Sequence, residues 1–319
     1  MTSTQQLAGT ALLDSDLLVV APEVRQALAD GHPVVALEST IISHGLPRPE
    51  NLRVATEVED IVRSRGAIPA TIAILDGHVL IGLDEPLLEQ VANRDDVVKV
   101  SMRDLATLVA RGGSGATTVA ATSHLASLVG IRVFATGGLG GVHREARDSW
   151  DESADLNTLA ITAMTVVCSG VKSILDVGAT LERLETLNVG ILTVGTNQFP
   201  GFYLSDSGFT CDWSVNDVDD IAAIMRARAA LSIPAALVVA NPLPESEQLD
   251  PDLHDQVLEE GLRLASARNI RGKDVTPFLL DHFHRATHGA SLMVNERIIV
   301  RNAELAARIA ATESAPGVS

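Results

Sequence analysis

Lysine is rare in this 319-residue sequence, and this makes one lysine a candidate for chemistry. Lys99, Lys172 and Lys273 are the only lysines among the 24 cationic side chains, and the rest are arginines. Lys172 lies in the segment TVVCSGVKSILDVG (165–178), directly after a β-branched run that is typical of a buried strand. A neutral lysine amine is a nucleophile, whereas a guanidinium group keeps its proton. Lys172 is therefore either a nucleophile or an ordinary lysine beside a strand.

Other groups that could do chemistry also follow predicted strands. Glu38 comes directly after the apolar run VVAL, and Lys99 lies within another short apolar run. The glycine-rich loop 112–115 and the long loop 136–155 lie at or just past such runs as well. Sites in open α/β sheets form beyond the carboxyl ends of the strands. The sequence therefore predicts that these groups and Lys172 meet at one edge of a sheet.

Two loops each allow a binding role or a structural role. The segment RGGSGATT is predicted to open a helix, where backbone N–H groups and the hydroxyls of Thr117 and Thr118 could bind a phosphate. A tight packing turn is the alternative. The second loop, HREARDSWDESADL, could bind Mg²⁺ or Mn²⁺ through oxygen ligands, or could be a solvated loop that caps the next helix. Its candidate ligands are His143, Glu145, Asp148, Asp151, Glu152 and Asp155.

The composition narrows the class of protein. A net charge of −17 argues against a general affinity for nucleic acid. No stretch approaches the roughly 18 apolar residues of a membrane span, and the N-terminus lacks a secretion signal. Cys168 and Cys211 have no metal-like spacing and fit a reduced, cytoplasmic protein. Near the C-terminus, His282, His284 and His288 have no carboxylate or thiol at matching spacing, and we expect surface residues rather than a metal site.

Strands alternate with helices along almost the whole chain. Strands are predicted at 34–37, on both sides of Asp76-Gly77, and at 97–100, 131–135, 166–168, 190–194 and 236–240. Helices are predicted at about 51–65, 180–188 and 218–230 and in the last part of the chain. This order predicts a three-layer α/β/α fold with a mixed, largely parallel central sheet. We expect one domain, 1–319, with a core from about residue 18 to 310, a loose lead-in over about the first twenty residues and a disordered tail after Ala311.

Several longer motifs carry a family resemblance. VVALESTIISHGLPRPEN, GAIPATIAILDG, GATTVA, FATGGLGGVHR, SADL, VKSILD, LVVANP and TPFLL occur in this order. Together they resemble the pseudouridine-5′-phosphate glycosidase family, also called indigoidine synthase A-like, over roughly residues 18–310. The resemblance implies a lyase-type glycosidase with an α/β/α fold, Mn²⁺ or another divalent cation, a small-molecule substrate and a homotrimer. Residues 169–171 and the loop 199–202 depart from the family pattern without touching its named roles.

The resemblance also implies roles for single residues. The lysine of VKSILD, Lys172, is the implied nucleophile, and the glutamate of ALEST, Glu38, is the implied general acid. The implied metal ligand is Asp151. Implied substrate contacts are Lys99, Val119, Ser153, Ala154 and Asp155. From the residues alone we add Thr118, at the predicted helix start, and Asn295, in an otherwise apolar and basic helix, as candidates for phosphate binding.

The implied reaction is the reversible cleavage of the C1′–C5 bond of pseudouridine 5′-phosphate to uracil and ribose 5-phosphate. The leaving group is a carbon, so the two-carboxylate glycosidase route has no leaving oxygen to protonate. Glu38 would instead protonate the ring oxygen, and neutral Lys172 would form an adduct at C1′ that accepts electrons. Lys99 would favour the neutral amine and bind the anionic substrate. The alternatives are a relative that forms C-glycosides in pigment or C-nucleoside biosynthesis and, disfavoured by the presence of Lys172 and Glu38, a non-catalytic phosphosugar-binding protein.

Overall fold

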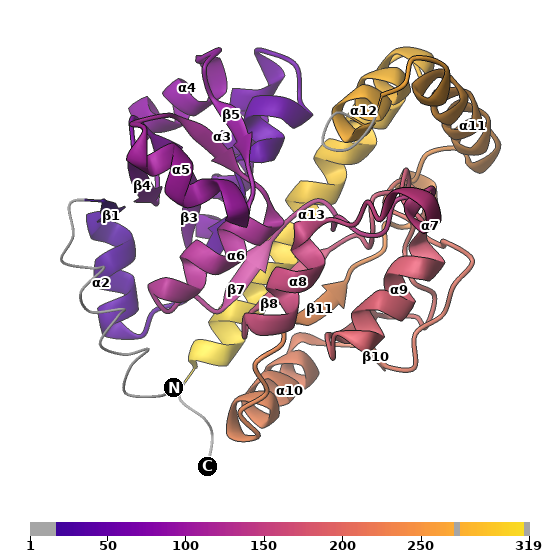
Figure 1. Cartoon of the computed structure of the whole chain (residues 1–319). Helices are drawn as coiled ribbons and strands as arrows, with labels where there is room; N and C mark the ends of the chain where they lie inside the picture. The colour runs from indigo at the N-terminus through magenta and orange to yellow at the C-terminus, as the bar shows by residue number, and fades with distance from the viewer. Residues whose placement is uncertain (1–16, 271–274, 316–319) are drawn as a thin grey trace.

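A mixed, mostly parallel sheet forms the centre of the molecule (Figure 1). The structure is a computed structural model and describes residues 17–270 and 275–315. In the main sheet the strand order is β3-β2-β7-β8-β11-β9-β10, and every neighbouring pair is parallel. Its strands are β2 (Val34–Leu37), β3 (Ile68–Leu75), β7 (Val133–Ala135), β8 (Thr165–Cys168), β9 (Gly190–Val194), β10 (Ser214–Val215) and β11 (Leu237–Ala240).

The long strand β3 continues into a second, smaller sheet. Its first half pairs with β2, and its second half pairs antiparallel with β4 (His78–Ile81) and β6 (Gly115–Thr117). β1 (Leu18–Val20) and β5 (Val98–Val100) complete this sheet. Asp76 and Gly77 join β3 to β4 with φ of 48° and 82°, the positive values that a tight hairpin turn requires. The predicted hairpin, and with it the mixed sheet, is confirmed.

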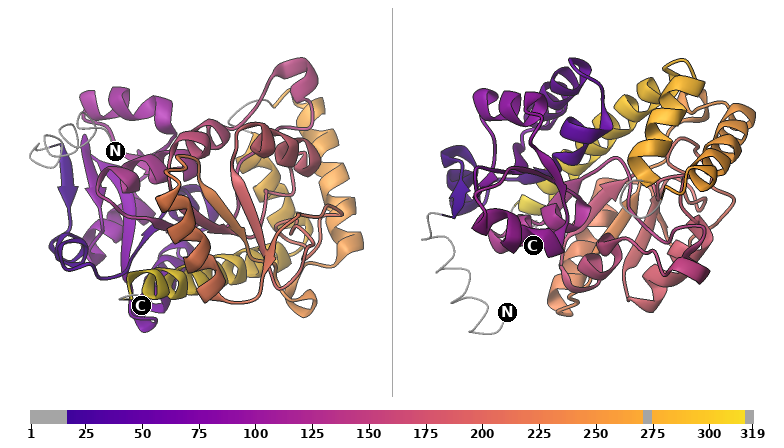
Figure 2. Two further views of the ribbon diagram at one scale, coloured as in Figure 1. Left: turned by 90° about the horizontal axis from the view of Figure 1, so that it is seen from below. Right: turned by 45° about the horizontal axis from the view of Figure 1, so that its top comes forward.

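Helices cover both faces of the main sheet, which gives three layers (Figures 1 and 2). Val35 and Val133 belong to one buried cluster and their neighbours Ala36 and Phe134 to another, because alternate residues of a strand face opposite sides of the sheet. The predicted three-layer α/β fold is confirmed. The helices are α2 (Pro22–Asp30), α3 (Glu50–Ser64), α4 (Glu85–Asn93), α5 (Leu105–Ala110), α6 (Val119–Leu128), α7 (Ala146–Ser149), α8 (Ala154–Ile161), α9 (Val177–Thr186), α10 (Val218–Ala230), α11 (Pro251–Ala267), α12 (Val275–Ala286) and α13 (Ala290–Ser314), with short helical turns η1 (Ile41–Gly45), η2 (Met102–Asp104) and η3 (Glu245–Glu247).

The C-terminal helix α13 crosses the back of the sheet, as the yellow helix in Figure 1 shows. Ala303, Ala306, Ala307 and Ala310 are all buried on it. Small side chains three and four residues apart lie on one side of a helix and let it approach its neighbours closely. Asn302, which is 0% exposed, is a polar exception on this helix. No helix among the described residues is long and apolar enough to cross a membrane.

The ends of the chain differ from two predictions. The predicted loose lead-in contains a paired strand, β1, because its alternating residues Leu18 and Val20 are buried beside β4. The predicted disordered tail after Ala311 is wrong for the residues up to Ser314, which continue α13. The rest of the predicted disordered ends, 1–16 and 316–319, lies outside the described residues.

The glycine-rich loop also differs from its prediction. It leads into strand β6 rather than directly into a helix, and α6 begins only at Val119. An added Cβ at Gly115 would lie 2.2 Å from Val100 Cγ2, so glycine permits β6 to approach β5. The hydroxyl of Thr117 donates to Ile72 O at 2.7 Å inside the protein. The Thr117 hydroxyl is therefore used inside the protein, and Gly115 has a packing role.

Candidate active site

Glu38 lies at the carboxyl end of β2 and is 8% exposed. The hydroxyl of Thr136, directly after β7, donates a hydrogen bond to Glu38 Oε1. Burial raises the pKa of Glu38, while the charge of Lys172, the Thr136 hydrogen bond and the charge of Lys99 act in the opposite direction. A carboxyl group with a raised pKa keeps its proton to higher pH, as a general acid requires.

Lys172 lies on a segment that is held against the loop after β7. Lys172 N donates to Leu139 O at 3.1 Å, and Leu139 N donates to Gly170 O at 2.9 Å. The chain turns at Gly170 with a φ of 82°, and an added Cβ there would come 2.1 Å from Pro200 O. Only glycine fits this turn. The backbone thus places Lys172 just past the carboxyl end of β8, at the same sheet edge as Glu38.

Glu38, Lys99 and Lys172 line two adjoining cavities that also share Thr40 and Thr276. We call the larger one, of about 360 Å³, the polar lobe, and the smaller one, of about 50 Å³, the apolar lobe. Besides the shared residues, the polar lobe is lined by Ser101, Arg103, Thr118, Val119, Gly140, His143, Asp151, Glu152, Ser153, Ala154, Asp155 and Leu175. The apolar lobe is lined by Ile41, His44, Gly45, Gly137, Gly138, Phe202, Pro277, Leu280 and Asn295.

The ten residues to which the resemblance or the residue types assign a role each line one of these lobes. Asn295 lines the apolar lobe and all the others line the polar lobe or both. The residues come from β2, β5, α6, α8, α13 and the loops between them, so the fold brings together groups that are far apart in sequence. Their individual roles in substrate binding stay predictions. The glycine-rich loop 112–115, which was predicted to meet them, and the candidate ligands Glu145 and Asp148 line neither lobe.

Asp155 holds two parts of the site together. Its Oδ1 accepts a hydrogen bond from Ala120 N and its Oδ2 accepts one from Gly140 N, both at 2.9 Å. The first N–H belongs to the start of α6 and the second to the loop after β7. An added Cβ at Gly140 would lie 2.6 Å from Asp155 Oδ2, so glycine is needed for this approach. The carboxylate therefore fixes the position of Val119 relative to the loop that pairs with Lys172.

Two hydroxyl residues precede the helices that border the polar lobe. Ser153 Oγ accepts a hydrogen bond from Asp155 N at 3.2 Å, which confirms the prediction that the acidic loop caps the next helix. Thr118 precedes α6, and its Oγ1 is buried without a hydrogen-bond partner among the described residues. A buried hydroxyl without a partner costs free energy unless a ligand or water binds it. Thr118 lines the polar lobe, although its hydroxyl oxygen is itself buried.

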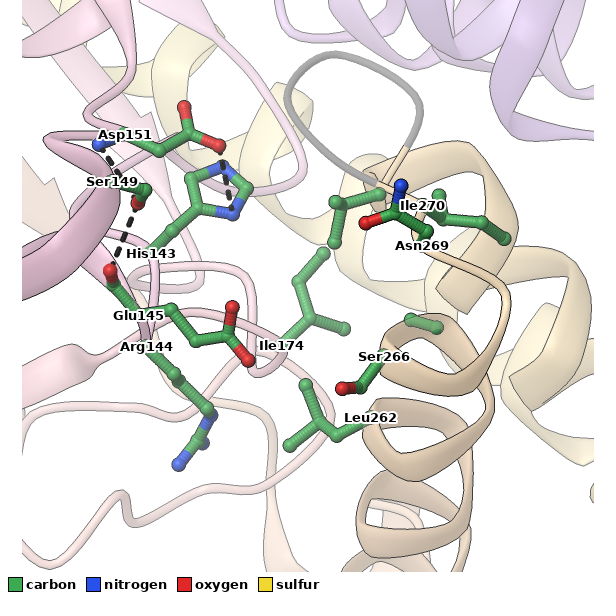
Figure 3. A pocket seen from close by; sticks show the side chains of 12 residues that line it. His143, Arg144, Glu145, Ser149, Asp151, Ile174, Leu262, Ser266, Asn269 and Ile270 are labelled. Atoms are coloured by element: carbon green, nitrogen blue, oxygen red, sulfur yellow. Dashed lines mark hydrogen bonds and ion pairs between the residues drawn. The ribbon is translucent and has the colours of Figure 1, made fainter.

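The acidic loop does not form a metal cage. A further cavity, of about 180 Å³, adjoins the polar lobe, and there His143 Nδ1 lies 3.8 Å from Asp151 Oδ2 (Figure 3). Glu152 is paired with Arg183 at 3.0 Å. Within residues 17–270 and 275–315, no three or more His, Cys, Asp or Glu side chains are placed to hold a metal ion. Asp151 fits only a cation that keeps most of its ligands as water, as Mg²⁺ and Mn²⁺ often do.

The C-terminal histidines were predicted to be surface residues, and this is wrong for part of the set. The side chain of His282 is only 14% exposed, because α12 packs against Gly261 of α11. His284 is half-buried, and its Nδ1 has no hydrogen-bond partner among the described residues, whereas His288 is exposed. Helix α12 is thus amphipathic rather than exposed on all sides.

Sequence reasoning missed a polar network behind the site. Asn302 Nδ2 donates to Thr136 O at 2.8 Å, and Asn302 Oδ1 accepts from Asn241 Nδ2 at 3.0 Å. Ser169 Oγ donates to Asn241 O at 2.9 Å. These residues tie the carboxyl ends of β7, β8 and β11 to α13. Thr136 was detectable as the first polar residue after an apolar run, but nothing in the local sequence of Asn302 indicated its contacts.

The chain matches the family model described as indigoidine synthase A like protein over residues 23–312. The chain belongs to this family. The predicted family is thereby confirmed. Among its relatives, the pseudouridine-5′-phosphate glycosidase of Salinispora tropica is 62% identical over 294 residues, covering 92% of this chain and 91% of that protein. The pseudouridine-5′-phosphate glycosidase of Streptomyces griseus is 59% identical over 293 residues, covering 92% of this chain and 91% of that protein.

Two solved structures share the fold of this chain. A prealnumycin C-glycosynthase in complex with ribulose 5-phosphate has a TM-score of 0.87 and 34% identity, covering 94% of this chain and 98% of its own. An indigoidine synthase A-like protein from Thermotoga maritima has a TM-score of 0.84 and 35% identity, covering 93% of this chain and 97% of its own. Both likenesses extend over almost the whole of each chain.

Proposed function

We propose that this protein cleaves the C1′–C5 bond of pseudouridine 5′-phosphate to give uracil and ribose 5-phosphate, and that the reaction is reversible. The relatives with the highest identities above are named for this activity. The observation that carries the proposal is that Glu38, Lys99 and Lys172 line both lobes, so an acid, a cation and an amine border the same space.

The residues of the site allow a balanced reaction. Glu38 gives its proton to the ring oxygen of ribose, the C1′–O bond breaks, and the electrons of the base stabilise C1′ until Lys172 Nζ bonds to it. As Nζ bonds to C1′ it gives a proton to the Glu38 carboxylate, which passes this proton to C5 of the base. The C1′–C5 bond breaks with its electrons going to the base, and the nitrogen electrons form a C1′–Nζ iminium group. One water molecule hydrolyses this group and frees ribose 5-phosphate and the Lys172 amine.

The chemistry of the two lobes orients the substrate. The polar lobe is lined by Lys99 and the exposed Arg103, two cations that suit a phosphate, and by Thr118 at the start of α6. The apolar lobe, with Ile41 and Phe202 among its lining side chains, suits the flat base. We therefore assign the phosphate to the polar lobe and the base to the apolar lobe. On this assignment Asn295, which lines the apolar lobe, lies on the side of the base rather than of the phosphate.

The cation, the assembly and the location are further parts of the proposal. Asp151 would hold Mn²⁺ or another divalent cation at the rim of the polar lobe, where the ion supplies positive charge for an anionic substrate. The motif resemblance supports a homotrimer, and the two cysteines without metal-like spacing support a cytoplasmic location. Light scattering of the purified protein would test the trimer.

Uracil release from pseudouridine 5′-phosphate with added Mn²⁺ tests the activity and the nucleophile together. Lys172→Arg is the matched variant because it keeps a cation of similar length but removes the nucleophile. We expect the intact protein to release uracil. In Lys172→Arg we expect the rate of uracil release to fall by at least about a thousandfold. Borohydride reduction during turnover should attach a ribose phosphate to Lys172 that mass spectrometry detects. No release by the intact protein would refute the proposal.

The solved C-glycosynthase supports one alternative, the synthesis of C-glycosides from ribose 5-phosphate and an acceptor other than uracil. This reaction uses the same residues in the opposite direction. A comparison of coupling rates for uracil and for larger aromatic acceptors distinguishes the two functions. Faster coupling of a larger acceptor would favour the alternative.

A further inference from the structure

Phe202 is an aromatic residue in a backbone conformation that favours glycine. Its φ is 66°, which lies in the left-handed region. A bulky side chain in this region costs free energy, and residues held there against their preference cluster at functional sites. The side chain is nonetheless 3% exposed and therefore firmly placed.

The surrounding structure holds this conformation from two directions. Phe202 N donates a hydrogen bond to Ser169 O at 2.9 Å, and Gly201 pairs with Gly170 in an isolated bridge. Both contacts are made with the segment that carries Lys172. The ring also contacts Tyr203 edge-on, with 4.7 Å between centroids. Phe202 is thus positioned by the same backbone that positions the proposed nucleophile.

The ring of Phe202 also lies against the two glycines after β7. An added Cβ at Gly138 would lie 2.6 Å from Phe202 Cδ2, and one at Gly137 would lie 3.6 Å from Phe202 Cε2. Gly137, Gly138 and Phe202 all line the apolar lobe, together with Leu280 and Asn295. The result is a small space, of about 50 Å³, that is lined by an aromatic ring together with Glu38 and Lys172.

We propose that Phe202 is a specificity-determining residue that contacts the base and limits it to a single flat ring of pyrimidine size. This inference rests on the proposed function and extends it to the choice of base. Stacking on an aromatic side chain stabilises any flat base, and the ring's rigid attachment sets the width of the space. Removing the ring should therefore weaken the binding of the base and leave the binding of the sugar phosphate unchanged.

The test replaces the ring by a flexible apolar side chain in Phe202→Leu. The matched control is Phe199→Leu, because Phe199 belongs to the same loop and is 0% exposed but does not line the apolar lobe. In the coupling direction we expect the KM for uracil to rise about tenfold or more in Phe202→Leu. The KM for ribose 5-phosphate should stay within about twofold, and acceptors larger than uracil should couple faster than in the intact protein. Phe199→Leu should change neither KM.

The same KM measurements can refute the proposal. An unchanged KM for uracil in Phe202→Leu, or parallel rises of both KM values, would refute the role of Phe202. If Phe202→Leu does not fold, Phe202→Met fills a similar volume without a flat ring and gives the same comparison.

Binding measurements separate this inference from the proposed function. In Lys172→Ala, calorimetry reports binding of pseudouridine 5′-phosphate without turnover, with and without the Phe202 change. Tight binding that the Phe202 change weakens, together with an intact protein that releases no uracil, would refute the reaction and keep the base contact. Equal binding in both variants would refute the base contact even if the intact protein is active.

Discussion

A substitution of Asp155 can distinguish a structural role of this residue from a contact with the substrate. In Asp155→Asn, an NH₂ group replaces one of the two carboxylate oxygens that accept hydrogen bonds from Ala120 N and Gly140 N. One charge-assisted hydrogen bond is lost, the other becomes weaker, and a backbone N–H in a buried position faces another donor. A hydrogen bond to a charged group contributes about 1.5–3 kcal/mol, so we expect a loss of about 3 kcal/mol in the free energy of unfolding.

Thermal unfolding followed by circular dichroism measures this loss. Because about 1 kcal/mol shifts the Tm of chains of roughly this size by about 2–4 °C, we expect a decrease of roughly 6–12 °C. Asp148→Asn is the control, since Asp148 is an exposed residue of the same loop, and its Tm should not change measurably. If Asp155→Asn has the same Tm as Asp148→Asn but loses activity, Asp155 is a substrate contact and its proposed structural role is wrong.

Three further predictions concern the acid and the cation. Because burial raises the pKa of Glu38 above its ordinary value of 4.5, its proton stabilises the native state most at low pH, and this contribution is lost as the pH rises through the native pKa. Glu38→Gln should therefore have a higher Tm than the intact protein at pH 8, with a difference that shrinks toward pH 4.5; a constant difference would contradict this. The Thr136 hydrogen bond lowers the pKa of Glu38, so in Thr136→Val the alkaline fall of kcat/KM should move to higher pH, and a move to lower pH would show that the assignment is wrong. Asp151→Asn should raise the Mn²⁺ concentration for half-maximal uracil release by about tenfold or more, whereas Asp148→Asn should leave it unchanged.

The sequence was sufficient wherever a local pattern or a long motif carried the information. The run VVAL, the turn Asp76-Gly77 and the strand at 190–194 have the predicted structures, because strand runs and tight turns depend on nearby residues. The placement of Glu38 and Lys172 at one sheet edge also followed from the order of strands and helices in the chain. The family followed from eight motifs in a fixed order.

Only the tertiary structure decided features that depend on partners distant in sequence. RGGSGATT has the composition of a phosphate loop, but pairing of β6 with β3 and β5 makes part of it a strand and uses the Thr117 hydroxyl internally. Asp155 is an ordinary acidic residue in the sequence, and its two backbone donors lie 35 and 15 residues away. The same reason applies to Phe202, whose left-handed backbone is fixed by Ser169 and whose ring reaches the site only because the loop folds back onto β8. Local sequence sets the strands and turns, whereas long-range hydrogen bonds and close glycine contacts set the shape of the site.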